Sequence, residues 1–274
     1  MAAPPSPPPP PPPAPLSLLP TPLPTPSLPP PPPVRVDIST HGFIPQTFGS
    51  SATPSYWASI LKTSVDALRP VYHNDSCPHW SLPPPVGQPG TVLARDGPSL
   101  DYLPSFNTRG PVVPQTLWRP IYPRTRELHV DHSPLCLPIF FIQQDAEGVG
   151  IPVLEALRKK THTLRDSYSP VELGGKTTTQ LRIRWSGYPE SHRQLQIRDE
   201  TQDRNPIALG RLATHVAKSM QRFFDAPGVP DSKADPRWRV GAGGIQLQDV
   251  ILIGVVHTSA GTWQPILQLS RSLP

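Results

Sequence analysis

Two short clusters, each made of two histidines and one cysteine, are the residues whose types best fit metal chemistry. The first cluster is His73, Cys77 and His79, and the second is His129, His132 and Cys136. Imidazole nitrogens and thiolates are ligands that zinc prefers, and together the clusters hold enough donors for a tetrahedral site. Their spacings match no standard zinc signature, and Pro78 and Pro134 restrict both loops. Surface histidines and inert thiols explain the same residues, so we assign no metal and no cofactor.

Cys136 also stands near two histidines of the type that serves as a general base. A cysteine nucleophile needs a lowered pKa, which a neighbouring cation provides and an apolar environment removes. Cys136 lies at the edge of the apolar run 137–142, where burial would raise the pKa of its thiol. We therefore expect an unreactive thiol, with His129 and His132 as ordinary histidines.

The stretch after this apolar run allows two further enzyme-like interpretations. Gly148 and Gly150 stand between a predicted strand and a predicted helix, as in a phosphate-binding loop. The third glycine, the lysine and the serine of the known fingerprints are missing, which favours a tight turn. The nearby carboxylates are Asp131, Asp145 and Glu147. Acidic residues are common at strand ends and helix starts, so we predict no catalytic residue and no enzyme.

Basic side chains on a predicted strand and a predicted helix form a candidate surface for nucleic acid. The members of this basic surface are Arg182, Arg184, Arg211, Lys218 and Arg222. Clustered lysine and arginine attract phosphate backbones. Glu190, Asp199, Glu200 and Asp203 lie close by in the sequence and weaken the positive charge. An ordinary solvated face explains the same pattern, and both interpretations stay open on the sequence.

The first 33 residues are dominated by proline and contain no charged side chain. Such a composition cannot bury enough apolar surface to fold, so we predict a disordered tail over 1–52 with local polyproline II structure. Pro30, Pro33 and Arg35 fit the PxxPxR pattern of ligands for SH3-type grooves. The tail is a candidate ligand for SH3, WW or profilin-like grooves, against the alternative of an extension that binds nothing.

Length and composition limit the class of protein. The chain has 274 residues with 44 prolines, two cysteines and a formal net charge of +5. Two cysteines are too few for a disulfide framework. No signal peptide and no apolar run of about 20 residues is visible. We therefore expect an intracellular protein, cytoplasmic or nuclear, that makes no membrane contact.

A helix and an extended arm are predicted over 53–125. The helix covers about 54–68, because Pro54 suits its first position, apolar residues follow at helical spacing, and Pro70 ends the pattern. Its single apolar face favours packing on the rest of the chain. From 71 to 124 glycine and proline recur too often for regular structure, yet large apolar side chains persist. We predict an arm that packs on the domain surface.

The density of apolar runs places the folded domain at 126–270. Its elements are short strands at 128–130 and 137–142, a helix from Pro152 to about 164, a hairpin at 180–185 and 194–198, a helix from Asn205–Pro206 to about 224, and strands at 250–256 and 263–269. From 137 onward the order is strand, helix, strand, strand, helix, strand, strand. This order predicts one small α+β domain with a mainly antiparallel sheet and helices on one face. Pro265 would protect the last strand as a sheet edge.

Several short phrases stand out along the chain: RDGP at 95–98, FNTRGP at 106–111, RELHVD at 126–131, LRIRWSGYP at 181–189 and WRVG at 238–241, followed by the strand at 250–256 and by Trp263–Gln264. In these phrases the sequence resembles uncharacterised proteins of mushroom-forming (basidiomycete) fungi. The resemblance covers roughly residues 70–270. It implies an intracellular fungal protein in which 71–124 belongs to the folded unit. It brings no activity and assigns no site residue.

These observations favour a non-catalytic protein-interaction module. The domain would bind a partner protein or a second copy of itself, and the proline-rich tail would add a weaker contact. The alternative is a nucleic-acid-associated protein that uses the basic hairpin and helix face.

Overall fold

A computed structural model gives the arrangement of most of the chain. It describes residues 38–71, 79–81, 101–104, 109–144, 148–199 and 201–273. All of these residues belong to a compact unit that runs from Val36 to Pro274.

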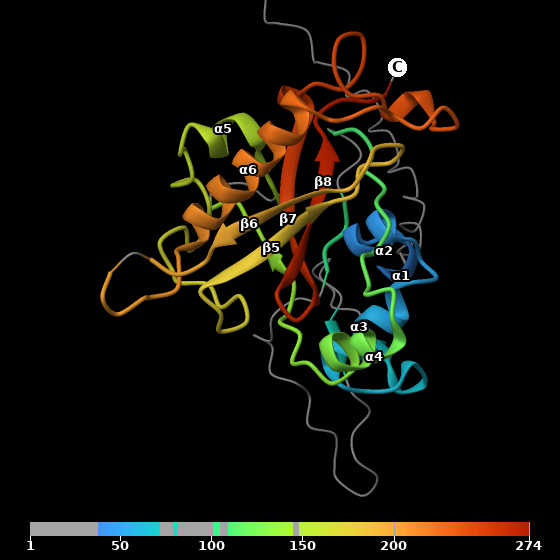
Figure 1. Ribbon diagram of the computed structural model, residues 1–274, viewed down its shortest axis with the longest axis vertical. Helices are drawn as coiled ribbons and strands as arrows, with labels where there is room; N and C mark the ends of the chain where they lie inside the picture. The colour runs from blue at the N-terminus through green and yellow to red at the C-terminus, as the bar shows by residue number, and fades with distance from the viewer. Residues whose placement is uncertain are drawn as a thin grey trace, which may run out of the picture. The chain divides into compact units, whose positions relative to one another are not determined.

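A six-stranded sheet lies at the centre of this unit (Figure 1). Its strands are β3 (Ile139–Phe140), β4 (Ile151–Pro152), β5 (Thr178–Ile183), β6 (Ser191–Gln196), β7 (Val250–Ser259) and β8 (Thr262–Leu269). The order across the sheet is β3-β7-β8-β5-β6, and β4 also pairs with β7. All pairs are antiparallel except the short parallel contact between β5 and β8. The predicted α+β class with a mainly antiparallel sheet is therefore confirmed.

Helices and short turns surround the sheet. The helices are α1 (Ile38–His41), α2 (Phe43–Phe48), α3 (Thr53–Leu61), α4 (Pro123–Arg126), α5 (Val153–Leu157) and α6 (Leu209–Asp225). A π-helical turn at Glu127–Asp131 continues α4, and 3₁₀ turns lie at Val65–Ala67, Pro236–Trp238 and Leu247–Asp249. A separate ladder joins β1 (Arg69–Val71) to β2 (His79–Ser81). Among the described residues, none of these helices has the length and apolar character to span a bilayer.

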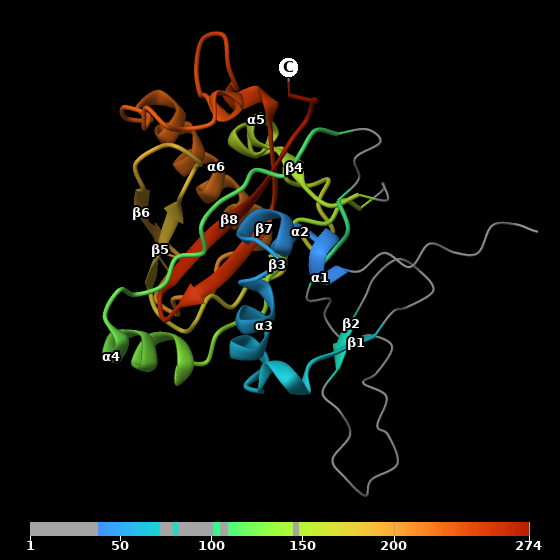
Figure 2. The ribbon, with the colours of Figure 1, turned by 90° about the vertical axis from the view of Figure 1, so that its right-hand side faces the viewer.

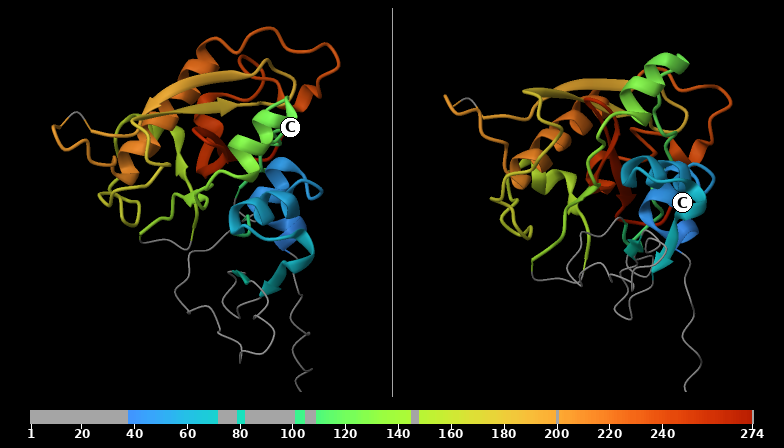
Figure 3. Two further views of the ribbon diagram at one scale, coloured as in Figure 1. Left: turned by 60° about the horizontal axis from the view of Figure 1, so that its bottom comes forward. Right: turned by 90° about the horizontal axis from the view of Figure 1, so that it is seen from below.

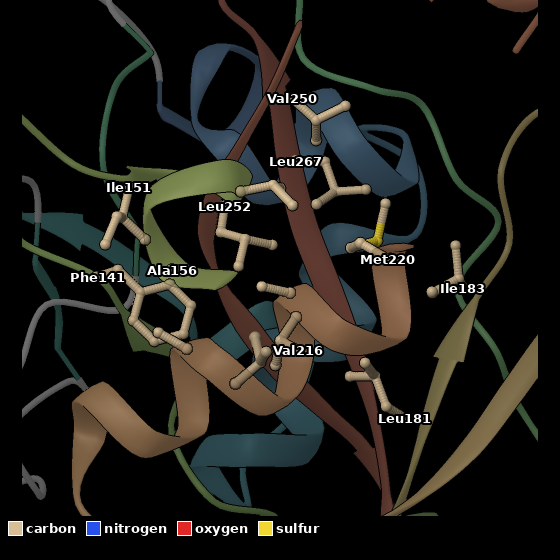
Figure 4. Close-up of a cluster of buried hydrophobic side chains, with 14 of the residues drawn as sticks. Phe141, Ile151, Ala156, Leu181, Ile183, Val216, Met220, Val250, Leu252 and Leu267 are labelled. Carbon is tan, nitrogen blue, oxygen red and sulfur yellow. The ribbon is translucent and has the colours of Figure 1, made fainter. Parts of the chain in front are cut away.

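The first face of the sheet is covered by α5 and α6. The 17 residues of α6 alternate between a wholly buried stripe and an exposed polar stripe, as an amphipathic surface helix should. Val216 and Met220 of this stripe are fully buried and point toward Leu252 and Leu267 of the two central strands (Figure 4). This face is therefore a core of aliphatic and aromatic side chains, built mainly from elements of the C-terminal half.

The second face of the same strands is covered by α2 and α3. Figure 2 shows these helices in front of β7 and β8. Phe43 and Trp57 are 1% and 0% exposed and belong to the same cluster as Ile253 and Ile266. Because both faces are covered, every residue of β7 and of β8 is buried. The helix predicted over 54–68 ends at Leu61, as α3, and it does pack on the rest of the chain as expected.

A capping interaction from a distant residue fixes the start of α2. Its N-cap is Gly42, which has no side chain to accept a helix N–H. The carboxylate of Asp101 accepts the backbone N–H of Ile44 at 3.0 Å instead. Burial raises the pKa of Asp101 well above its ordinary value, although the backbone N–H groups of Tyr102, Ile44 and Phe43 oppose that shift. The second face thus depends on contacts between segments far apart in the sequence.

An extended arm at 109–118 completes the edge of β8 that β5 leaves open. Val113 donates its backbone N–H to Leu267 at 2.9 Å, and Leu269 donates to Pro111 at 3.0 Å. The buried amide of Gln264 accepts the N–H of Trp118 at 2.6 Å and donates to the carbonyl of Thr116 at 3.1 Å. The arm is therefore tied to the sheet by hydrogen bonds as well as by apolar contacts.

Several predicted element boundaries differ from the structure. Residues 127–131 form the π-helical turn rather than a strand, the predicted helix from Pro152 ends at Leu157, and α6 begins at Leu209 rather than at Asn205. Asn205 and Pro206 instead pair with the chain that follows β6. Pro265 lies in β8, which is an internal strand, so the expectation that this proline protects a sheet edge is wrong.

The folded unit also starts earlier than the boundary predicted at residue 53. The compact unit begins at Val36, and α1 and α2 lie before the predicted boundary. Phe43, Ile44 and Phe48 supply the apolar surface that holds this segment on the sheet. Because the neighbouring residues are mostly polar or glycine, the sequence did not indicate that these three apolar residues pack on the sheet.

Candidate functional site

A polar groove of about 440 Å³ lies on the second face of the sheet, over β5 and β6. It lies where α2 and α3 no longer cover the strands, and the α4 segment is next to the β5–β6 hairpin (Figure 3). The groove is lined by Trp118, Pro120, Thr125, His129, Lys176, Thr178, Thr179, Gln180, Arg182, Gln194 and the 259–262 turn. Hydroxyl, amide and cationic groups dominate this lining, and none of the described residues that form it is acidic.

Strand alternation explains the floor of the groove. Leu181 and Ile183 are 1% exposed and pack in the core beneath α6. Gln180 and Arg182 alternate with them and therefore point to the opposite face. Gln194 is paired with Gln180 in the register of the two strands, so it joins the same floor. The β5–β6 hairpin thus presents its apolar side to the core and its polar side to the groove.

The aromatic wall of the groove is held by a cation–π contact. The guanidinium carbon of Arg182 lies 4.3 Å from the ring centroid of Trp118. The same guanidinium forms an ion pair with Glu190 and donates to the side chain of Gln180 at 2.9 Å. These contacts fix Arg182 in place, and one face of the Trp118 ring is already occupied.

The opposite wall is the turn between β7 and β8. Ala260 donates its backbone N–H to the carbonyl of His129 at 2.7 Å, which joins the two walls. Gly261 has a φ of +90°, and a Cβ there would lie 3.2 Å from the Nζ atom of Lys176. Lys176 therefore lies across this turn, and it has no ion-pair partner within the described residues.

An open strand edge runs beside the groove. β6 is the last strand of the sheet on that side. Ile197 donates its backbone N–H to Thr177 at 3.0 Å, and Gln180 donates away from β6, to Gly261, at 2.9 Å. In an antiparallel ladder, this alternation directs the backbone N–H and C=O groups of His192 and Gln194 outward. Within the described part of the chain, no hydrogen bond reaches those groups.

The five residues of the predicted basic surface lie on two sides of the sheet. Arg182 and Arg184 lie on the groove side, where both interact with Glu190. The other members lie on the exposed stripe of α6, on the first face, and they are Arg211, Lys218 and Arg222. The structure therefore does not bring the five together into one surface.

The residues considered for metal binding are also dispersed. His129 and His132 are exposed, Cys136 is half-buried with a free thiol, and His79 lies in β2. His73 and Cys77 lie outside the described residues. Across the part of the chain that the structure describes, no group of three or more His, Cys, Asp or Glu side chains has the arrangement of a metal site.

Of the remaining candidate residues, some lie in described parts of the chain and others do not. Gly148, Val149 and Gly150 form an extended segment rather than the predicted tight turn: Val149 bridges Ile142, Gln143 donates its backbone N–H to Gly148, and Gly150 donates to Phe141. Helix α5 begins three residues later, at Val153. Asp131 is exposed at the end of the π-helical turn. The others lie outside the described residues, and they are Asp145, Glu147, Glu200, Pro30, Pro33 and Arg35.

A buried histidine beside Cys136 was not found from the sequence. His257 is 2% exposed, stacks on Trp263 at 4.5 Å, and its Nδ1 atom accepts the backbone N–H of Cys136 at 2.8 Å. Burial lowers the pKa of His257 to about 4, so the ring is neutral. Burial also raises the pKa of the Cys136 thiol, and Glu172 adds to that shift. The hydrogen bond to the neutral imidazole comes from the backbone N–H of Cys136 and not from its thiol, so this contact is structural and does not activate a nucleophile.

Comparisons with family models, with curated proteins and with solved structures find no match to this chain. The geometry of the groove and of the strand edge is therefore the basis for the functional argument.

Proposed function

We propose that this protein is a protein-binding module that takes an extended, acidic segment of a partner protein along β6 and the adjacent groove. The observation that carries the proposal is the open edge of β6, whose outward backbone groups lie beside a groove that contains cations. The proline-rich tail would add a second, weaker contact with proline-binding grooves. The same proposal places the module inside the cell, where a free thiol such as Cys136 stays reduced.

The strand edge supports an extended peptide as the ligand. A peptide that adds to a sheet edge gains main-chain hydrogen bonds, and alternate side chains fall into neighbouring pockets. His192 and Gln194 present a donor and an acceptor each at the spacing of a β-ladder. On the groove side, the ligand's side chains would meet Gln194 and Gln180. This arrangement matches a strand better than a compact ligand.

The charges support an acidic segment. Lys176 and Arg182 line the groove, and none of the described residues that line it carries a carboxylate. Glu190 already offsets part of the charge of Arg182, so Lys176 is the stronger attraction for an incoming carboxylate. The uncharged composition of residues 1–33 makes the chain's own tail a poor match for these cations.

The same geometry argues against single-stranded nucleic acid as the main ligand of this groove. Sites for single strands combine a basic track with exposed aromatic rings on which bases stack. Arg182 covers one face of Trp118, the aromatic residue of the lining. The arginines of the hairpin and those of α6 also lie on opposite faces, which interrupts any continuous basic track.

Fluorescence anisotropy with a labelled peptide of alternating glutamate and valine tests the proposal. Replacing Lys176 and Arg182 by alanine should weaken binding roughly tenfold, because two charge-assisted contacts are lost. His192→Pro should weaken it by a similar factor, because it removes one outward N–H group while leaving the ladder to β5 intact. His192→Ala is the matched control, since it changes the side chain and keeps the N–H group.

Three outcomes would reject this function. Equal affinity of His192→Pro and the unchanged protein would show that the strand edge is not used. A salt-sensitive affinity for oligo(dT) well above that for the peptide, lost in the Lys176 and Arg182 variant, would favour the nucleic-acid alternative. Peptide-independent dimerisation that His192→Pro abolishes would instead identify a second copy of the chain as the occupant.

A further inference from the structure

A second cavity, of about 460 Å³, lies on the other face of the molecule, between the start of α6 and the segment that follows α5. Its lining is basic and hydroxylic, and consists of Lys159, Thr161, Ser167, Tyr168, Ala208, Gly210, Arg211, Thr214, His215 and Lys218. A volume of this size falls in the range of small-molecule sites. We call this cavity the α6 pocket, and it shares no residue with the groove over β5 and β6.

The cations of the α6 pocket converge from two elements. Arg211, His215 and Lys218 are four and three residues apart on α6, so they share one side of the helix. Lys159 joins them from the turn after α5, with a φ of +59°. Among the described residues, no carboxylate lines the pocket, and none of Lys159, Arg211 and Lys218 forms an ion pair. The positive charges of the pocket are therefore not balanced by an acidic side chain of the described residues.

The pKa of His215 reflects the excess of positive charge in the pocket. Its Nδ1 atom lies 3.1 Å from the carbonyl oxygen of Gln196, so Nδ1 carries the proton and donates. Burial lowers the pKa of His215, the positive charges of Arg211 and Lys218 lower it further, and the Gln196 carbonyl opposes them. An anion bound between these groups would reverse the repulsion and favour the imidazolium.

Hydroxyl groups lie against the first turn of α6. A Cβ at Gly210 would lie 2.5 Å from the hydroxyl oxygens of both Thr161 and Ser167, so glycine is needed for this close approach. Neither hydroxyl has a hydrogen-bond partner within the described part of the chain. The backbone N–H groups of Leu209 and Gly210 already donate to the carbonyls of Ser169 and Ser167. Side chains, rather than these helix amides, are therefore what the pocket offers to an anion.

Tyr168 adds an aromatic surface at the same place. It lines the pocket and is 84% exposed, which core packing does not explain. An exposed aromatic ring next to a set of cations suits a ligand that has both a flat ring and a phosphate. We propose that the α6 pocket binds a nucleoside phosphate, with the phosphates against Arg211, Lys218 and Lys159 and the base on Tyr168.

Isothermal titration with ATP, sodium tripolyphosphate and adenosine tests this site. ATP should bind one molecule per chain, and the double variant Arg211→Ala, Lys218→Ala should weaken it by roughly a hundredfold. Tyr168→Ala should weaken ATP roughly tenfold and leave tripolyphosphate unchanged, because only the base stacks on the ring. Arg222→Ala is the matched control, since Arg222 lies on the exposed stripe of α6 outside the pocket.

A second measurement tests the site without relying on a binding constant. The imidazole signals of His215, followed by NMR across pH, should shift to a higher pKa when ATP is added. The substituted residues are on the surface, so far-UV circular dichroism should show an unchanged fold. Full ATP affinity in the double variant would overturn the proposal, and so would equal affinities for ATP and tripolyphosphate, which would show that no base is recognised.

Discussion

The two faces of β7 and β8 are equally buried but are built in different ways. The face under α5 and α6 is a core of aliphatic and aromatic side chains whose elements come mainly from one stretch of the chain, 139–269. The face under α2 and α3 is assembled from segments that lie up to about 200 residues from the strands they cover; Phe43, for example, belongs to the same buried cluster as Ile253. This second face also contains buried amides, among them Gln264 and Gln268 at 0% exposure.

The same two strands are thus stabilised on one face by a helix with its own amphipathic pattern and on the other face by segments far away in the sequence. On the first face, α6 carries its own amphipathic pattern, and burial follows from that pattern. On the second face, short helices with no side-chain cap of their own depend on Asp101 and on the arm. The free energies of unfolding of variants on each face show whether the two faces contribute equally to stability.

Trp57→Ala should cause the largest loss of stability among these variants. Removing a fully buried indole leaves a cavity and costs about 3–5 kcal/mol. Leu212→Ala, a 2% exposed position on the first face, should cost about 2–5 kcal/mol and is the matched comparison. Urea unfolding, followed by tryptophan fluorescence and by circular dichroism, measures both. A loss below about 1 kcal/mol for Trp57→Ala would show that the second face is only loosely docked.

His257 should make the end of β7 sensitive to acid. Its pKa is lowered from 6.5 to about 4, so the folded state favours the neutral ring. Stability from this group is complete above pH 6.5 and is lost as pH falls toward 4, because only the unfolded state takes up the proton. The loss amounts to about 3 kcal/mol over that interval. Unfolding free energies at pH 7 and pH 4.5, compared with those of His257→Asn, measure it.

The comparison with His257→Asn separates this residue from the carboxylates of the protein. The variant should be less stable at pH 7, and its stability should fall less between pH 7 and pH 4.5. Parallel pH profiles for the two proteins would show that His257 is solvated in the folded state. In that case, the end of β7 would be more open than the first face as a whole.

Gln264→Leu should have the smallest effect and bears on the polar character of the second face. The substitution keeps most of the volume but leaves the N–H of Trp118 and the carbonyl of Thr116 without their partner. A cost of about 1–3 kcal/mol is expected for buried polar groups left unpaired. Gln248→Leu, at an exposed position, is the control and should change stability by less than about 0.5 kcal/mol. Thermal unfolding of the two variants gives the difference.

The Gln264→Leu variant also connects the second face to the proposed peptide site. Trp118 forms the aromatic wall of the groove and depends on Gln264 for its position. Gln264→Leu should therefore weaken the binding of the acidic peptide, and Gln248→Leu should not. Unchanged peptide affinity together with normal stability would mean that the arm holds its place without the amide.

Periodicity made part of the site predictable. The alternation of Leu181, Arg182 and Ile183 correctly indicated one buried and one wet side of the hairpin. The spacing of Arg211, His215 and Lys218 correctly indicated one polar stripe of the helix. What the spacing cannot specify is which side of the sheet the helix covers. The prediction of a single basic surface joined two stripes that the fold separates.

The sequence by itself determined the β5–β6 hairpin, the strands β7 and β8, the main helix and the α+β class, because those features follow from the period of apolar residues along a short stretch. Only the tertiary structure decided that 38–61 covers the second face, that the arm at 109–118 completes β8, and that β6 is the open edge. These outcomes depend on contacts across as many as 200 residues, where no local pattern records the partner. The cavities beside the hairpin and beside α6 exist for the same reason, since each is bounded by segments that the fold, and not the sequence order, makes neighbours.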